Sequence, residues 1–167
     1  MKFTMIRTVL LTALLFLTGC GEGDAPLASA SVSPDSGSGG KGTFIVSFTD
    51  PKGAQHIKSA RVLFNGVIDG RQACYVFVDR AQNAFFLIND NGEGSQKATS
   101  EGVENSQCRV EKAELLPTKD DKSVQISLKL AFKPAFKGRK QVFLAVDDAE
   151  GHSPDLKAHG TWIVPSR

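Results

Sequence analysis

The sequence has no surplus of basic charge that would suit a nucleic-acid partner. Its 167 residues include 20 lysines and arginines against 18 aspartates and glutamates, with no basic run. Lys2 and Arg7 lie in the first 19 residues, and without them basic and acidic residues are equal in number. Because nucleic-acid-binding domains display a basic patch or stripe, we predict no nucleic-acid partner.

Motifs for catalysis and cofactor binding are also missing. No Gly-x-Ser-x-Gly occurs, so the nucleophile elbow of that type is excluded. Gly37, Gly39 and Gly42 have the spacing of a dinucleotide-binding loop, but that loop must open a helix. Here the residues that follow alternate as a strand. We therefore predict that the protein is not an enzyme and uses no cofactor.

The sequence has only three histidines, and few of its histidines and acidic residues are spaced to form a metal site. His152 and His159 flank one predicted loop and could approach each other as ligands, although loop histidines more often face solvent. Acidic residues gather at turns, and the calcium candidates among them are Asp147, Asp148, Glu150 and Asp155. Neither this cluster nor Asp90 with Glu93 follows the EF-hand order, so we expect solvated turn acids and assign no metal.

Long apolar runs are absent beyond the first 20 residues, MKFTMIRTVLLTALLFLTGC. Lys2 and Arg7 form a positive n-region, and Val9–Leu17 form an apolar segment too short for an easy bilayer span. These features predict a signal peptide over residues 1–19.

The end of this segment, Leu17-Thr18-Gly19-Cys20, resembles the lipobox of bacterial lipoproteins. The resemblance implies cleavage before Cys20 and attachment of fatty acid, such as palmitate, to its thiol and new amine. Gly21 stands where an aspartate would favour inner-membrane retention, so the outer membrane is favoured. An ordinary secretory signal with a chance cysteine is the alternative. The expected location is thus the cell envelope, with the protein lipid-anchored and facing the periplasm or the cell surface.

Two strands joined by a tight turn dominate the middle of the chain. Cys74–Asp79 and Ala84–Asn89 are rich in β-branched and aromatic residues and flank the polar Arg80–Asn83. Both faces of this hairpin are apolar, which predicts a place inside a packed sheet rather than at its rim.

Alternating patterns continue along the chain with no convincing helix after the signal, apart from one helical turn at Ala54–Lys58. The pattern predicts an all-β fold, an antiparallel immunoglobulin-like β-sandwich of eight or nine strands. Besides the hairpin, the expected strands are Ser29–Ser33, Thr43–Thr49, Ser59–Phe64, Arg109–Leu115, Ser123–Lys133, Lys140–Asp147 and Gly160–Val164.

Composition divides the chain into three parts. After the signal, residues 20–42 begin with the lipidated Cys20 and are rich in Gly, Ser, Ala and Pro, a composition that predicts a flexible linker. Within this linker, Ser29–Ser33 is a candidate edge strand. Residues 43–167 form the predicted sandwich domain. Within it, Glu93–Gln107 is almost without apolar residues and is expected to be a long surface loop.

The cysteines that follow the signal peptide also indicate an exported protein. With Cys20 acylated, Cys74 and Cys108 remain, and two thiols in an exported chain normally pair. Closing a loop of roughly 35 residues stabilises a fold by about 3–4 kcal/mol in the chain-entropy model. Two free buried thiols are the alternative. A zinc site would need further ligands at suitable spacing, and the sequence lacks them.

Four segments, in order, resemble one family. They are ACYVFVDRAQNAFFLINDNG from Ala73, NSQC from Asn105, LAFKPAFKGRKQVFLAVDDAEG from Leu130 and HGTWIV from His159. The family is an uncharacterised immunoglobulin-like or fibronectin-like β-sandwich module of secreted and surface bacterial proteins. The resemblance implies the fold and both cysteines but no reaction or ligand. This chain departs from the family's usual tandem arrays by having one module on a lipid anchor.

Aromatic side chains offer one possible binding surface. Tyr75, Phe77 and Phe86, with Trp162, could form a platform for a glycan or a partner protein, although strand aromatics are more often core. Trp162 is the expected core anchor.

We predict a membrane-anchored envelope lipoprotein with a non-catalytic binding or structural module. Its partners would be the membrane, through the lipid, and an unidentified envelope protein or glycan. The alternative is a small periplasmic enzyme or inhibitor that acts through residues 93–107.

Overall fold

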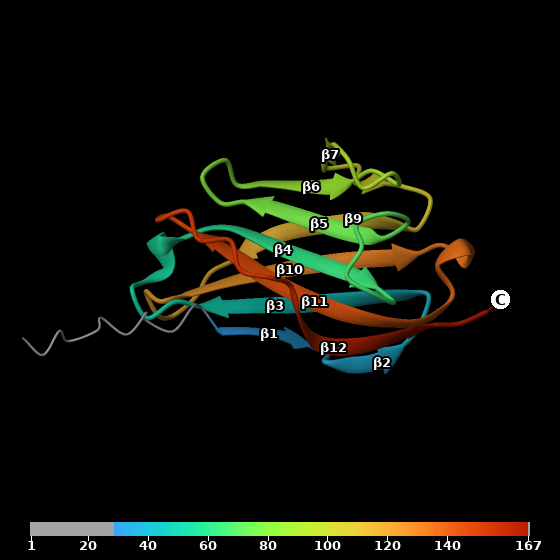
Figure 1. Cartoon of the computed structure of the whole chain (residues 1–167), viewed down its shortest axis with the longest axis horizontal. Helices are drawn as coiled ribbons and strands as arrows, with labels where there is room; N and C mark the ends of the chain where they lie inside the picture. The colour runs from blue at the N-terminus through green and yellow to red at the C-terminus, as the bar shows by residue number, and fades with distance from the viewer. Residues whose placement is uncertain (1–28, 167) are drawn as a thin grey trace, which may run out of the picture.

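A computed structural model describes residues 29–166, which form two β-sheets packed against each other (Figure 1). The five-stranded sheet has the order β1-β3-β10-β9-β8, and all its pairs are antiparallel. Its strands are β1 (Ser29–Ser33), β3 (Lys41–Thr49), β8 (Val103–Glu104), β9 (Cys108–Leu116) and β10 (Ser123–Phe132).

The second sheet has seven strands in the order β2-β12-β11-β4-β5-β6-β7, and only the β2–β12 pair is parallel. Its strands are β2 (Ser36–Ser38), β4 (Ile57–Asn65), β5 (Cys74–Asp79), β6 (Ala84–Ile88), β7 (Ser95–Lys97), β11 (Gly138–Asp148) and β12 (Lys157–Val164). Two short 3₁₀ turns, η1 (Ala54–His56) and η2 (Pro134–Phe136), complete the fold.

The antiparallel β-sandwich predicted from the sequence is confirmed, and residues 29–166 form twelve strands in place of the expected eight or nine. The three strands that were not predicted are β2, β7 and β8. Each has only two or three residues, too few to show a periodic pattern in the sequence. Among residues 29–166, no helix has the length and apolar character needed to cross a membrane.

Strand β10 shows why the alternation was informative. Its even-numbered side chains from Val124 to Phe132 are buried, and the odd-numbered ones between them are half-buried or exposed. Because successive side chains of a strand point to opposite faces, this pattern places one face of β10 in the core between the sheets.

An aromatic cluster fills the end of the core near β12. The ring of Phe44 lies 4.8 Å from that of Phe64 and 5.0 Å from that of Trp162, centroid to centroid, in edge-on geometry. Trp162 is 7% exposed, and its Nε1–H donates to the carbonyl oxygen of Gly39 at 2.9 Å. Trp162 is therefore a core anchor, as predicted, and not part of an exposed aromatic platform.

The glycines that mimic a dinucleotide loop surround this tryptophan. A Cβ atom on Gly37 would lie 2.5 Å from Cζ3 of Trp162, and one on Gly42 would lie 3.3 Å from its Cζ2. The glycine spacing thus lets the β2 and β3 backbones approach the indole ring closely.

The predicted boundary between linker and domain is wrong. Ser29–Ser33 is a strand, as suggested, but β2 and the start of β3 also lie within the region predicted as linker. Their small residues serve close packing against Trp162, and β2 pairs with Thr161–Ile163. The sandwich therefore includes Ser29–Ser33 and Ser36–Ser38 and does not begin at Thr43. The predicted signal peptide and Cys20 lie outside the described residues.

The central hairpin is confirmed, but its environment differs from the prediction. β5 lies between β4 and β6, whereas β6 is followed only by the short β7 at the rim. Cys74, Val76 and Val78 are buried between the sheets, while Tyr75 and Phe77 are half-buried on the outer face. The described residues do not cover that face fully, so one face of the hairpin packs in the core and the other is partly exposed.

Candidate functional site

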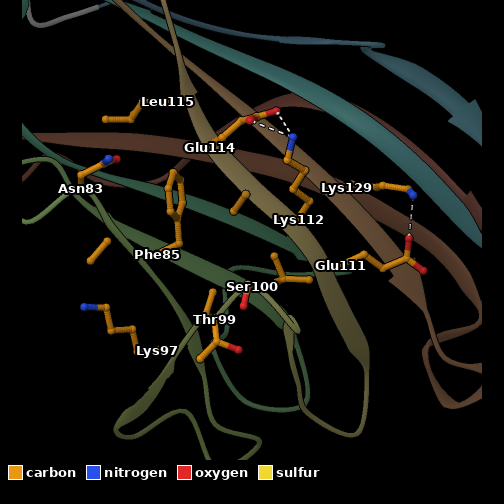
Figure 2. Close-up of a pocket in the computed structure, with 14 residues that line it drawn as sticks. Asn83, Phe85, Lys97, Thr99, Ser100, Glu111, Lys112, Glu114, Leu115 and Lys129 are labelled. Atoms are coloured by element: carbon orange, nitrogen blue, oxygen red, sulfur yellow. Dashed lines mark hydrogen bonds and ion pairs between the residues drawn. The ribbon is translucent and has the colours of Figure 1, made fainter.

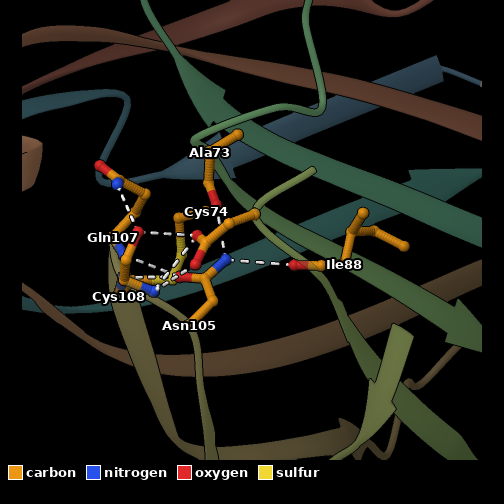
Figure 3. Close-up of a disulfide and its surroundings, with 8 residues drawn as sticks. Ala73, Cys74, Ile88, Asn105, Gln107 and Cys108 are labelled. Carbon is orange, nitrogen blue, oxygen red and sulfur yellow. Dashed lines mark hydrogen bonds between the residues drawn. A yellow bond between two sulfur atoms is a disulfide. The ribbon is translucent and has the colours of Figure 1, made fainter. Parts of the chain in front are cut away.

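The disulfide predicted from the sequence is confirmed. Cys74 of β5 and Cys108 of β9 are bonded, with their Cα atoms 5.6 Å apart, and both residues are fully buried (Figure 3). Since β5 belongs to the seven-stranded sheet and β9 to the five-stranded sheet, the bond fastens the two layers to each other.

Asn105 provides a second, non-covalent fastening beside the disulfide. Its Nδ2 donates to the carbonyl oxygens of Ala73 at 2.8 Å and Ile88 at 3.1 Å. Its Oδ1 accepts from the backbone N–H of Gln107 at 2.9 Å and Cys108 at 3.0 Å, as Figure 3 shows. All of these bonds are formed by a buried side chain, so the end of the 93–107 segment is attached to the residue before β5 and to the last residue of β6.

The sequence analysis missed the role of Asn105, although it sits in the NSQC segment. An asparagine followed by Gln107 and Cys108 suits a local turn in which the side chain accepts backbone N–H groups. Ser106 adds to it by bonding the carboxylate of Asp90 through its Oγ, at 2.8 Å. The segment predicted as a surface loop is therefore an ordered structure that contains β7 and β8.

A cleft of about 650 Å³ opens between the two sheets at the side where β6 faces β9 (Figure 2). The ring of Phe85 forms one wall, and Ala113 and Leu115 of β9 lie on the other. The polar lining comes from both sheets and from the 93–107 segment, and it comprises Asn83, Lys97, Thr99, Ser100, Glu111, Lys112, Glu114 and Lys129.

A β-bulge explains why the cleft forms here. The pairing of β10 with β9 shifts register so that Leu130 pairs with Val110 but Lys129 pairs with Lys112. The extra residue, Glu111, moves the inward side of β9 onto Ala113 and Leu115, which are only half-buried. Strand β8 pairs only with Arg109 and Val110, so no described strand of the sheet covers the rest of β9.

Ion pairs organise the charged lining of the cleft. Lys112 Nζ lies 2.9 Å from Glu114 Oε2, and Lys129 Nζ lies 3.3 Å from Glu111 Oε2 (Figure 2). Hydrogen bonds from Lys41 and Lys129 lower the pKa of Glu111 below its ordinary value. The cleft thus combines one aromatic wall with charges of both signs.

The fold does not bring the residues of the predicted aromatic platform together on one surface. Phe77 and Phe86 are half-buried on the outer face of the seven-stranded sheet, with ring centroids 6.2 Å apart. Tyr75 packs instead against a small apolar cluster of Leu63, Ala73 and Phe143. Only the phenylalanine pair therefore remains as a candidate contact on that face.

The four calcium candidates do not form one site. Asp147 lies 2.9 Å from Arg61 Nη2 and accepts a hydrogen bond from Ser59 Oγ at 2.6 Å. Asp155 is exposed in the following loop. Asp148 and Glu150 meet His56 instead, a residue that the sequence analysis did not associate with them.

The two loop histidines are placed in different surroundings. His152 Nδ1 lies 2.7 Å from Asp148 Oδ2. His159 is half-buried in β12, where burial, and secondarily the charge of Lys157, lowers its pKa. The structure therefore associates His152 with the acidic turn and gives His159 a separate environment.

Comparisons with known proteins show no family for this chain. No protein-family model matches the chain, and no curated protein does. Among solved structures, murine CRIg is similar to this chain with a TM-score of 0.37 and 10% sequence identity, over 83% of this chain and 98% of CRIg.

Proposed function

We propose that the protein is a lipoprotein of the bacterial cell envelope whose β-sandwich is a non-catalytic binding module. The observation that carries this proposal is the buried Cys74–Cys108 disulfide that joins the sheets. Disulfides form and persist in oxidising compartments, which supports export by the N-terminal segment. The similarity to a module of bacterial surface proteins, carried by the four segments from Ala73 to Val164, supports the same location.

The anchor is fatty acid on Cys20, with the outer membrane as the favoured membrane. Ser29 already belongs to the sandwich, and the chain from Cys20 to Ser29, even if fully extended, would span only about 30 Å. The β1 edge of the sandwich would therefore lie close to the membrane.

The binding surface in this proposal is the cleft between β6 and β9, and the ligand is an extended segment of another envelope protein. Beyond Val110, the described residues offer β9 no strand partner other than β10. An unpaired strand edge can take up an extended peptide by backbone hydrogen bonding, while neighbouring pockets receive alternate side chains. Phe85 and the lysines of the cleft lie beside that edge.

An enzyme or inhibitor that acts through residues 93–107 was the alternative from the sequence. Lys97, Thr99 and Ser100 of that segment line the same cleft. The binding proposal therefore already includes contact between this segment and the ligand in the cleft. No observation favours a reaction at the cleft, and we propose none.

The anchor is tested by Cys20→Ser in a two-membrane bacterium. The wild-type protein should fractionate with membranes and carry acyl mass on its N-terminal residue. The variant should be released to the soluble fraction or remain unprocessed. Identical fractionation of the two proteins without acyl mass would overturn the lipoprotein proposal.

The cleft is tested by a photo-crosslinking amino acid at Lys112, whose side chain is 65% exposed. Arg71, 72% exposed in the loop before β5, is the matched control. A discrete protein adduct should form in cells at Lys112 but not at Arg71, and Ala113→Arg, which fills the cleft, should abolish it. The same adducts at both positions, or none at Lys112, would count against this surface.

A further inference from the structure

A second group of side chains that could bind a ligand lies outside the proposed cleft. His56 ends the η1 turn, Asp148 ends β11, and Glu150 follows in the next loop. Each offers one ligand atom, and these atoms all lie within 4.8 Å of one another. No residue of this group lines the cleft.

Strand pairing brings these distant residues together. β4 pairs with β11, and a register shift between Asp147 and Asp148 sets Asp148 opposite Ile57. The backbone N–H of Ala149 then donates to the carbonyl oxygen of His56 at 2.8 Å. The irregularity leaves Asp147 with Arg61. Asp148, whose side chain is 10% exposed, bonds Nδ1 of His152 at 2.7 Å and has a carboxylate oxygen within 4.8 Å of a ring nitrogen of His56.

The imidazole of His56 is held in a defined orientation. Its Nδ1 lies 2.8 Å from Oδ2 of Asp50, and the other oxygen of Asp50 accepts the backbone N–H of Lys52 at 2.8 Å. The Nε2 atom is buried and makes no well-formed hydrogen bond with the described residues, and Oε1 of Glu150 lies 3.5 Å from it. A carboxylate that orients one ring nitrogen while the other is free to coordinate is the usual arrangement around a metal-binding histidine.

We propose that His56, Asp148 and Glu150 bind a divalent transition-metal ion, with zinc as the probe that defines the site. Zinc is bound by imidazole nitrogen and carboxylate oxygen, and three protein ligands leave a position for water. Calcium needs six to eight oxygen ligands, and an imidazole nitrogen favours transition metals over calcium and magnesium. The imidazole nitrogen beside the two carboxylates is thus what separates this site from a calcium-binding turn.

The ammonium group of Lys52 competes with a metal ion for the carboxylate of Glu150. Its Nζ lies 2.9 Å from each oxygen of Glu150 and holds the pKa of that carboxylate below its usual range. The Nδ1 contact with Asp50 raises the pKa of His56, although burial opposes the shift. Zinc binding must therefore displace the ammonium group from Glu150, and it requires His56 with a deprotonated Nε2.

The test is calorimetric titration of zinc into the metal-stripped full-length protein, with Cys20 acylated or replaced by serine so that no free thiol competes. One zinc ion per chain is expected, and excess calcium should not displace it. His56→Gln and Glu150→Gln should each weaken zinc binding by about tenfold or more. The control is Glu104→Gln, because Glu104 is also an exposed acid paired with a lysine, 49% exposed against 50% for Glu150.

Lys52→Gln gives the sharpest readout, because a residue with only a structural role would not strengthen metal binding when removed. Freed from the ammonium group, Glu150 should bind the ion more tightly, so zinc affinity should rise severalfold. Zinc binding that is absent, displaced by calcium, or equal in His56→Gln, Glu150→Gln and Glu104→Gln would overturn the site. Unchanged or weaker binding by Lys52→Gln would overturn the competition.

Discussion

Gly37 lies directly against the indole ring of Trp162, with which it also pairs in the parallel β2–β12 register. A Cβ atom at Gly37 would stand 2.5 Å from Cζ3 of the ring, closer than any tolerable contact. Gly40, three residues away, has open space around it. The two glycines therefore provide a matched pair for testing how the N-terminal strands are packed.

Gly37→Ala should destabilise the domain by about 1–3 kcal/mol, because the ring or the β2 backbone must move. Gly40→Ala should change stability by no more than about 0.5 kcal/mol. Trp162 is the only tryptophan, so its fluorescence reports its environment directly during denaturant unfolding. Equal effects of the two substitutions would mean that β2 does not pack on Trp162.

The strands with a regular pattern were predictable, and the N-terminal ones show the limit of that method. In β10, alternation alone identified the buried side chains from Val124 to Phe132. In Ser36–Ser38 there is no apolar residue to alternate, and its place is set by Trp162, far away in sequence. Composition therefore suggested a linker where the structure has a strand.

The candidate sites depend on irregularities that no pattern reveals. The cleft exists because Glu111 is an extra residue in β9, and the histidine cluster exists because the β4–β11 register shifts at Asp148. The sequence supplied Asp148 and Glu150 as candidates, but only the pairing of strands shows that His56 joins them. Local sequence can suggest ligands at one turn, whereas a site shared between strands requires the register.

Leu128 is completely buried at the centre of β10, whereas Gln125 on the same strand is half-buried on the other face. Leu128→Ala should lower the free energy of unfolding by about 2–5 kcal/mol through lost burial and a residual cavity. Gln125→Ala should stay within about 0.5 kcal/mol. Urea denaturation of both variants checks this, and small, equal losses would place the core on the wrong face of β10.

Asn105 satisfies two carbonyl oxygens and two backbone N–H groups from within the protein. Asn105→Ala would leave these buried groups without partners, and we expect a loss of about 2–5 kcal/mol. Asn91→Ala is the control, because exposed Asn91 accepts only one N–H, from Glu93. Hydrogen exchange should quicken at Gln107 and Cys108 in the first variant only. Unchanged exchange there would show that the turn does not depend on the Asn105 side chain.

Reduction of Cys74–Cys108 tests the fastening between the sheets. Loss of the bond removes about 3–4 kcal/mol in the chain-entropy model, which corresponds to a melting temperature lower by roughly 10–15 °C for a domain of this size. Intact mass with and without alkylation establishes the redox state, and thermal melts with and without reductant measure the effect. Two free thiols in protein purified from the envelope, or an unchanged melt after complete reduction, would contradict this role.

Asn105 makes the same experiment more informative, because its side chain attaches the chain beside Cys108 to Ala73, the neighbour of Cys74. After reduction of the wild-type protein, these hydrogen bonds should still hold residues 93–107 in place, so the fold should survive at lower stability. In Asn105→Ala both fastenings would be lost, and residues that share contacts do not contribute additively. Reduction should therefore lower the melting temperature by more in Asn105→Ala than in the wild type. Equal decrements in the two proteins would show that the disulfide and Asn105 act independently.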